Sequence, residues 1–187
     1  MAFVPRLNST GILNNPKWYD ENVFYIAGYG MPNCTCYAWG RFWEESNSDL
    51  TSMDHKPTNL PTGDGGQWWQ QNIDSGAYEY GSIPKLGAVI CFADNNGGAG
   101  HVAIVEEIDS SGNLTTSNSA WGGTYFWTDT VNNNQGNYNW SHYTFQGFIY
   151  NPYAEQPTPP EPTERTTKHK FKWAIFTHKI RQNRSRL

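Results

Sequence analysis

The feature that most constrains the fold of this 187-residue chain is an apolar segment that begins just after Pro32 with a cysteine, Cys34. Proline and the residue before it both disfavour continued helix, so the preceding element is expected to end there. From Tyr37 to Glu45, apolar and aromatic residues recur in helix-like steps, and the two tryptophans between them leave little polar surface. The sequence therefore predicts a buried helix with Cys34 at or near its first turn.

Cys34 has two interpretations. A thiol in the first turn of a helix faces unpaired backbone N–H groups and the positive end of the helix dipole, which is expected to lower its pKa and favour a nucleophilic thiolate. A lone cysteine in an apolar helix is more often a small buried hydrophobic residue. A matching base elsewhere in the chain decides between the two interpretations.

The order of the remaining signals predicts an α+β fold. A short helix is expected around Phe24 to Ile26, and a second helix over Gln67 to Asp74 with Ser75 and Gly76 as its stop. From Pro84 onward the chain consists of short apolar or alternating runs separated by turns. These expected strands are residues 87–92, 101–106, 114–119, 125–127 and 145–150. Helices followed by strands predict helices packed on an antiparallel sheet.

The candidate base is His101, which opens one of these strands directly after a glycine-rich loop ending at Gly100. A turn over residues 109–112 would pair this strand with the next one and place Asn118 near His101. The Asn118 oxygen would then accept the imidazole N–H and orient the base. A histidine at a strand end is usually a surface residue, and the chain has many asparagines. The joint arrangement is what predicts cysteine nucleophilic catalysis.

The segment Asn33 to Arg41, NCTCYAWGR, resembles the signature around the nucleophile of CHAP domains, the cysteine, histidine-dependent amidohydrolase/peptidase family. Residues 87–92, GAVICF, and residues 100–106, GHVAIVE, resemble the second signature of that family in the expected order. The resemblance covers roughly residues 25–150. It implies a papain-like CHAP fold and a peptidoglycan hydrolase that cuts a peptide bond or the sugar–peptide amide, as in many bacteriophage lysins.

Carried over by this resemblance, Cys34 is the nucleophile, His101 is the general base, and Asn33 helps the Cys34 backbone N–H to hold the oxyanion. Asn118 occupies a position where the family often has Glu, and Ala120 replaces a usual Asn. An amide orients an imidazole but does not stabilise the imidazolium by charge, so the third catalytic role of Asn118 departs from the family pattern.

Two aromatic residues that follow Asn118, Trp121 and Tyr125, are predicted to border the groove and bind substrate. Glycines beside aromatic side chains suit the close approach of an extended peptide–sugar strand. For Trp127 and Trp140, packing in the core explains the pattern equally well.

No cofactor, metal site or disulfide framework is expected. Residues 22–33 contain no Asp or Glu, which argues against the calcium loop that some CHAP domains carry before the cysteine, and no His/Cys/Asp cluster suggests zinc. The three cysteines form no spacing pattern, and Cys36 and Cys91 are expected in the core.

Charge and proline content divide the chain into a catalytic domain of residues 1–153, a proline-rich linker of residues 154–164 and a basic tail or short helix of residues 165–187. The tail holds eight of the 13 Lys and Arg residues and none of the 17 acids. Its expected partners are anionic wall polymers, a membrane surface or phage virion tail proteins, and a solvated tail without a partner is the simplest alternative. Nucleic acid is not expected because no recognisable binding module is present.

The predicted substrate is bacterial peptidoglycan, and the predicted protein is a phage endolysin or virion-associated lysin. Residues 1–10 lack the apolar core of a signal peptide, and no segment is apolar enough to span a membrane. The expected location is therefore the phage virion, or the host cytoplasm with release to the wall. The alternatives are a non-catalytic virion protein that grips the wall with the same fold, and a cysteine amidase acting on a small molecule.

Overall fold

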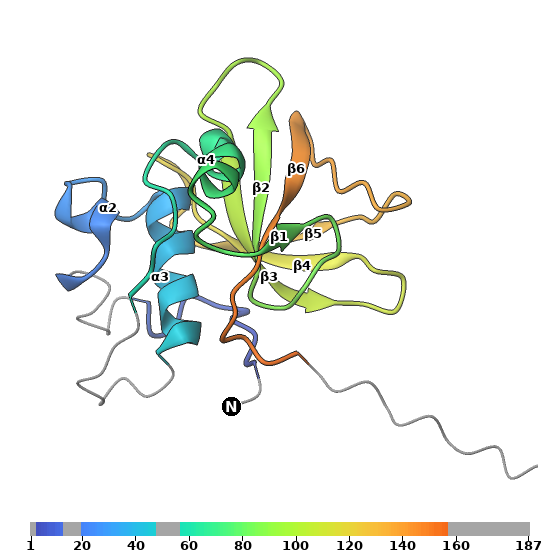
Figure 1. Cartoon of the computed structure of the whole chain (residues 1–187), viewed down its shortest axis with the longest axis horizontal. Helices are drawn as coiled ribbons and strands as arrows, with labels where there is room; N and C mark the ends of the chain where they lie inside the picture. The colour runs from blue at the N-terminus through green and yellow to red at the C-terminus, as the bar shows by residue number, and fades with distance from the viewer. Residues whose placement is uncertain (1–2, 13–19, 48–56, 157–187) are drawn as a thin grey trace, which may run out of the picture. The chain divides into compact units, whose positions relative to one another are not determined.

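The computed structural model describes residues 3–12, 20–47 and 57–156, and within them helices precede strands along the chain (Figure 1). The helical elements are α2 (Val23–Ile26), α3 (Cys34–Ser46), the 3-10 turn η1 (Gly65–Gln67) and α4 (Trp68–Ser75). The strands are β1 (Tyr80–Gly81), β2 (Val89–Asp94), β3 (His101–Ile108), β4 (Leu114–Asn118), β5 (Trp127–Val131) and β6 (Tyr143–Ile149). The predicted α+β class is confirmed.

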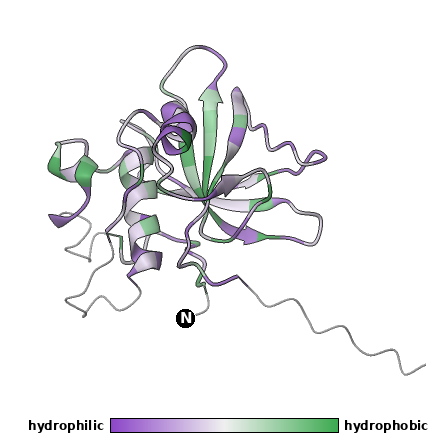
Figure 2. Ribbon diagram, viewed as in Figure 1, coloured by the Kyte–Doolittle hydropathy of each residue, from purple (hydrophilic) through white to green (hydrophobic). Residues whose placement is uncertain are grey.

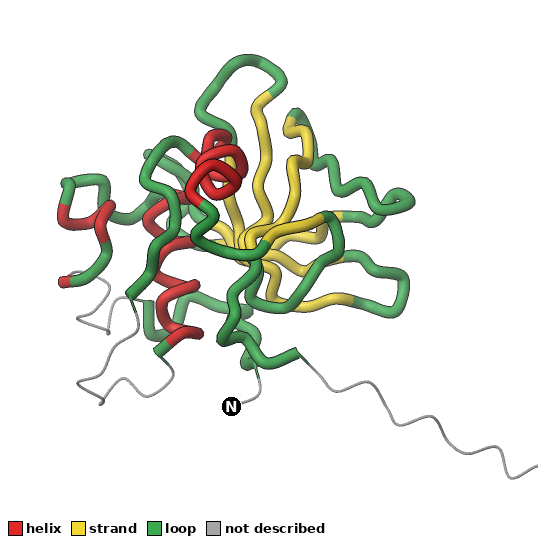
Figure 3. The backbone as a smooth tube through the Cα atoms, in the orientation of Figure 1, coloured by secondary structure: helices red, strands yellow, loops and turns green. Residues whose placement is uncertain are grey.

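The strands form one antiparallel sheet in the order β1-β6-β2-β3-β4-β5. Strands β2 to β5 are neighbours in chain order, and β6 returns to pair with the free side of β2. The helices gather on one side of this sheet (Figure 3), where α3 packs on β3 and β4 and α4 packs on β6.

Side chains alternate between two buried layers, one on each face of the sheet. Cys91 and Val102 face the helices, whereas Phe92 and Ala103 face a second apolar layer on the opposite side. The central strands are therefore buried on both faces, and they are the hydrophobic strands in Figure 2. Cys36 and Cys91 are both fully buried in the helix-side layer, as expected.

Helix α3 begins where the sequence predicts it, because the asparagine before it acts as its N-cap. The Asn33 Oδ1 atom accepts hydrogen bonds from the backbone N–H groups of Thr35 at 2.8 Å and Cys36 at 3.3 Å. Helix α4 is shifted by one residue from its expected bounds and ends at Gly76, which has a φ of 62° in the left-handed region.

A buried polar network attaches α3 to the sheet. The Arg41 guanidinium donates from Nε and Nη2 to the two carboxylate oxygens of Glu106, at 3.0 Å and 2.9 Å. Ser117 donates to the same carboxylate at 2.7 Å, and the Tyr37 hydroxyl donates to Ser117 at 2.8 Å. Burial acts to lower the pKa of Arg41, but its hydrogen bonds and charge attraction with Glu106 outweigh burial and raise it. The network holds α3 in register with β3 and β4.

The packed part of the chain continues to Gln156. Ala154 is buried, and the Gln156 side chain exchanges hydrogen bonds with the backbone of Leu86. The first residues of the predicted linker thus still contact the domain, while residues 157–164 and the predicted basic tail lie outside the described residues. Within the described ranges, every helix is too short or too polar to cross a bilayer.

Candidate active site

Cys34 is the first residue of α3 and remains partly exposed, in contrast to Cys36, which is completely buried. The thiol lies beside the start of β3, because the backbone N–H of Val102 is one of its hydrogen-bond donors. Tyr143, whose ring centroid is 5.7 Å from that of His101, is also within electrostatic reach of Cys34. The fold therefore places Cys34 beside the start of β3, the strand that His101 opens.

The expected lowering of the Cys34 pKa is wrong. Burial raises the pKa of the thiol, and the backbone N–H groups of Val102, Thr35 and Cys34 itself offset only part of that effect. The negative charge of Asp64 raises the pKa further. The helix start does supply N–H groups, but loss of contact with water is the larger effect at this position.

His101 is oriented by Asn118, as predicted. The His101 Nε2 atom lies 3.1 Å from Asn118 Oδ1, and both side chains are buried. The Asn118 Nδ2 group donates to the backbone oxygen of Thr116 at 3.2 Å and to its Oγ1 at 3.0 Å, which fixes the amide with its oxygen toward the imidazole. An acceptor at Nε2 assigns the proton to that nitrogen and leaves Nδ1 unprotonated.

Four aromatic rings enclose His101, and no pattern in the sequence predicts that they form a group. Their centroids lie 5.5 to 6.5 Å from that of the imidazole. This aromatic cage consists of Phe92, Trp127, Trp140 and Tyr143. Burial lowers the pKa of His101 to about 4, against a smaller opposing effect of the bond to Asn118. Trp127 pairs directly with Asn118 across the sheet. This pairing of β4 with β5 places Trp127 in the aromatic cage.

The two shifts define the resting state of the pair. A thiol with a raised pKa beside an imidazole with a lowered pKa is neutral near pH 7. An amide at position 118 suits this state, since it binds the neutral imidazole without favouring the imidazolium.

Asn33, the predicted oxyanion residue, is held beside Cys34 by hydrogen bonds of its side chain and backbone. Its Oδ1 caps α3, its backbone N–H donates to Ser119 Oγ at 3.0 Å, and its Nδ2 donates to the backbone oxygen of Tyr29 at 3.3 Å. The amide has a second Nδ2–H, which gives it one donor for a ligand.

The turn of residues 64–67 forms another part of the site. It lies at the end of a polar, turn-rich segment of the sequence. The Gly66 N–H donates to the Ala99 oxygen at 2.8 Å. A Cβ on Gly65 would lie 3.1 Å from the His101 backbone, and one on Gly100 would lie 2.4 Å from the Gly66 backbone. Glycines on both sides allow this backbone-to-backbone packing, which brings Asp64 near Cys34.

The two predicted substrate-binding aromatic residues differ in exposure. Trp121 is 66% exposed, and its ring centroid lies 6.0 Å from that of Tyr29, which is 55% exposed. Tyr125 is partly buried and packs against the helix-side layer. Trp121 thus offers an open aromatic surface near Asn33, and substrate contact by either residue stays a prediction.

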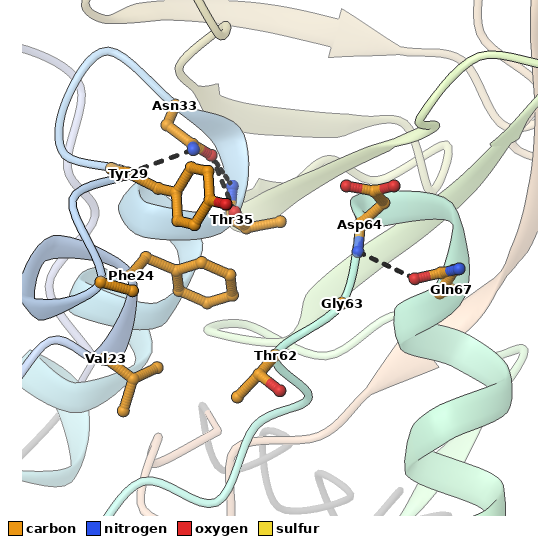
Figure 4. Close-up of a pocket in the computed structure, with 10 residues that line it drawn as sticks. Val23, Phe24, Tyr29, Asn33, Thr35, Thr62, Gly63, Asp64 and Gln67 are labelled. Carbon is orange, nitrogen blue, oxygen red and sulfur yellow. Dashed lines mark hydrogen bonds between the residues drawn. The ribbon is translucent and has the colours of Figure 1, made fainter.

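A pocket of about 370 Å³ lies next to Cys34, between α2, the start of α3 and the segment that leads into η1 (Figure 4). Asn33 and Thr35, the two neighbours of Cys34, form part of its wall, and Asp64 lies on the opposite side. Across the described ranges no group of three or more His, Cys, Asp or Glu residues is arranged to hold a metal ion.

Comparison with known proteins relates the chain to one protein family and to solved structures. The family model of the CHAP domain matches residues 24–120, a range that contains Asn33, Cys34, His101 and Asn118. Among solved structures, the chain is similar to an N-acetylmuramoyl-L-alanine amidase from Staphylococcus aureus, with 24% sequence identity and a TM-score of 0.39. The match covers 55% of this chain and 29% of the amidase chain.

Proposed function

Because the CHAP family model matches more than half of its residues, this chain belongs to the CHAP domain family, and we propose that it hydrolyses peptidoglycan with Cys34 as the nucleophile. The observation that carries the proposal is the oriented imidazole. His101 Nε2 is fixed on Asn118 at 3.1 Å, and the partly exposed Cys34 lies beside the same strand end. A buried structural cysteine would require neither feature.

In the proposed reaction, His101 Nδ1 takes the proton from Cys34 Sγ as the sulfur attacks the carbonyl carbon of a peptide or amide bond. The Cys34 backbone N–H and Asn33 Nδ2 donate to the carbonyl oxygen as negative charge develops on it. The imidazolium then protonates the leaving amine, the C–N bond breaks, and a thioester remains. Water, deprotonated by His101, attacks the thioester, and the released thiolate recovers its proton from the imidazolium.

The bond cut is either a peptide bond of the stem or cross-bridge, or the amide between N-acetylmuramic acid and L-alanine. We further propose, from the resemblance of the motifs to phage lysins, that the protein acts as an endolysin or a virion-associated lysin. Mass spectrometry of fragments released from defined cell walls identifies the bond. Immunoblotting of purified virions distinguishes a virion-attached lysin from a free one.

Zymography on purified cell walls tests the enzymatic proposal. Cys34→Ala is expected to abolish clearing, and Cys36→Ala, two residues along the same helix, is expected to retain it if the variant folds. Circular dichroism of each variant verifies the fold. Clearing by a folded Cys34→Ala variant, or wall binding without clearing by the wild type, would refute hydrolysis through this cysteine.

A further inference from the structure

We infer that the pocket beside Cys34 binds a positively charged amine of the substrate, with Asp64 as its counter-ion. The inference rests on the proposed function and adds the class of group that the enzyme recognises next to the bond it cuts.

The position of the pocket ties it to the reacting atoms. Asn33 and Thr35 flank the nucleophile in sequence, and both contribute to the pocket wall. Asp64 lines the same pocket and is close enough to Cys34 for its charge to act on the thiol. A substrate whose carbonyl lies at Cys34 thus has an adjoining group within reach of this pocket. Figure 4 shows Asn33 and Thr35 on one side of the pocket and Asp64 on the other.

The negative charge of Asp64 favours a positively charged ligand in the pocket. Of the ten described residues that line it, Asp64 is the only ionisable acid or base apart from the Tyr29 phenol. Asp64 is exposed, and within the described part of the chain no Lys, Arg or His forms an ion pair with it. A carboxylate in this situation attracts a cation and repels the carboxylates of a peptide.

Asp64 is also held in place, as a recognition residue requires. Its backbone N–H donates to Gln67 Oε1 at 3.0 Å, and the preceding Gly63 N–H donates to Gln71 Oε1 at 3.2 Å. The packing of η1 against Gly100 anchors the turn that follows. The backbone that carries the Asp64 carboxylate is therefore fixed before any substrate binds.

The opposite wall is apolar. Val23, Phe24 and Ala27 belong to or follow α2 and line the pocket together with Tyr29. A group with an aliphatic stem and an ammonium end satisfies both walls, since the stem covers the apolar side and the ammonium faces Asp64. The diamino acid of a peptidoglycan stem peptide has this chemistry.

Calorimetric binding of two peptides to the full-length Cys34→Ser protein tests the inference without requiring hydrolysis. The probes are L-alanyl-γ-D-glutamyl-L-lysyl-D-alanine and the same peptide with an acetylated lysine side chain. We expect the free amine to bind about fivefold more tightly, the effect of one partly exposed charge pair. Asp64→Asn in the Cys34→Ser protein should remove this preference. Asp74 is an exposed acid on α4, and Asp74→Asn should preserve the preference.

Equal affinity for the two peptides in the presence of Asp64, or a preference that survives Asp64→Asn, would overturn the inference. The result is separate from that of the zymogram. Loss of clearing in Cys34→Ala together with equal peptide affinities would leave the hydrolase proposal intact and remove the amine site alone.

Discussion

At the scale of single residues, Asn118 determines how the candidate base works. It fixes the His101 tautomer through one hydrogen bond, and its own orientation is fixed by two bonds to Thr116. Because the amide is uncharged, burial in the aromatic cage dominates and the pKa of His101 falls to about 4. The site is therefore arranged for a neutral thiol–imidazole pair.

Replacing the Asn118 amide by a carboxylate tests whether the uncharged amide keeps the pKa of His101 low. In Asn118→Asp, a negative charge at His101 Nε2 stabilises the imidazolium, so the pKa of His101 is expected to rise by about 1 unit or more. NMR titration of the labelled imidazole measures the pKa directly. The acid limb of kcat/KM should move to higher pH in parallel. Asn118→Ala serves as the control, since it removes orientation without adding charge and should lower activity about tenfold or more. An unchanged His101 pKa in Asn118→Asp would contradict the assigned geometry.

The sequence predicts the place of Cys34 at the helix start and the contact of His101 with Asn118, because each of these depends on a local feature. Cys34 follows a helix cap, and Asn118 is one hairpin away from His101, so a turn is enough to place one near the other. The aromatic cage and Asp64 depend on segments that meet only in the folded chain. The direction of the Cys34 pKa shift also depends on them, because it results from how completely these segments exclude water.

At the scale of elements, the contact between η1 and the start of β3 positions the site. Gly100 has a φ of 72°, and a Cβ there would lie 2.4 Å from the backbone of Gly66. The contact of η1 with the start of β3 could not be predicted from the sequence, since a contact between two backbones leaves no pattern of side chains. Helix α3 could be predicted, because its cap and apolar repeat are both local.

Gly100→Ala is expected to displace η1, to destabilise the fold by about 3 kcal/mol, and to reduce activity strongly. Gly97→Ala is the matched control, because Gly97 also has a positive φ, of 78°, yet a Cβ there meets nothing within 4 Å. The control should lose only about 1 kcal/mol from backbone strain. Urea unfolding and wall clearing measure the two effects. Equal losses in the two variants would show that the η1 contact does not position the site.

The attachment of α3 to the sheet depends on one carboxylate. Glu106 is fully buried and accepts hydrogen bonds from Arg41, Ser117 and the backbone of Arg6. Glu106→Gln leaves a buried guanidinium without its main counter-charge, so we expect a loss of about 3 kcal/mol in the free energy of unfolding. The neighbouring Glu107 is exposed, and Glu107→Gln should change stability by less than about 0.5 kcal/mol. Chemical denaturation of both variants makes the comparison, and similar midpoints would contradict the role of the network.

At the scale of the whole molecule, the buried imidazole makes folding depend on pH. The pKa of His101 is about 4 in the folded protein, below the ordinary histidine value of roughly 6.5. Above pH 6.5 neither state binds the proton. As the pH falls from 6.5 toward 4, the unfolded chain takes up a proton that the folded chain excludes, so folding loses stability. Between pH 7 and pH 4.5 the loss from this residue is about 2 kcal/mol.

Urea unfolding of the wild type and His101→Gln at the two pH values isolates this contribution, because other titrating groups are common to both proteins. The wild type should lose about 2 kcal/mol more than the variant on acidification. Identical losses would mean that the pKa of His101 is the same in the folded and unfolded states, and the lowering of that pKa by burial would then be wrong.

The strong division of charge along the chain leads to a prediction about localisation on the wall. Residues 165–187 hold eight basic residues and no acid, whereas all 17 acids belong to the rest of the chain. We propose that this tail attaches the protein to anionic wall polymers, as clustered basic residues attach to anionic surfaces. Replacing Lys168, Lys170 and Lys172 by Gln should weaken retention on purified walls roughly tenfold or more at low salt.

Retention of the wild type should fall as salt rises, and the difference between the proteins should disappear at about 1 M salt, where charges are screened within roughly 3 Å. Cleavage of a soluble muropeptide should be equal in both, since no described part of the site includes the tail. Unchanged retention in the triple variant would assign wall binding to the catalytic domain alone.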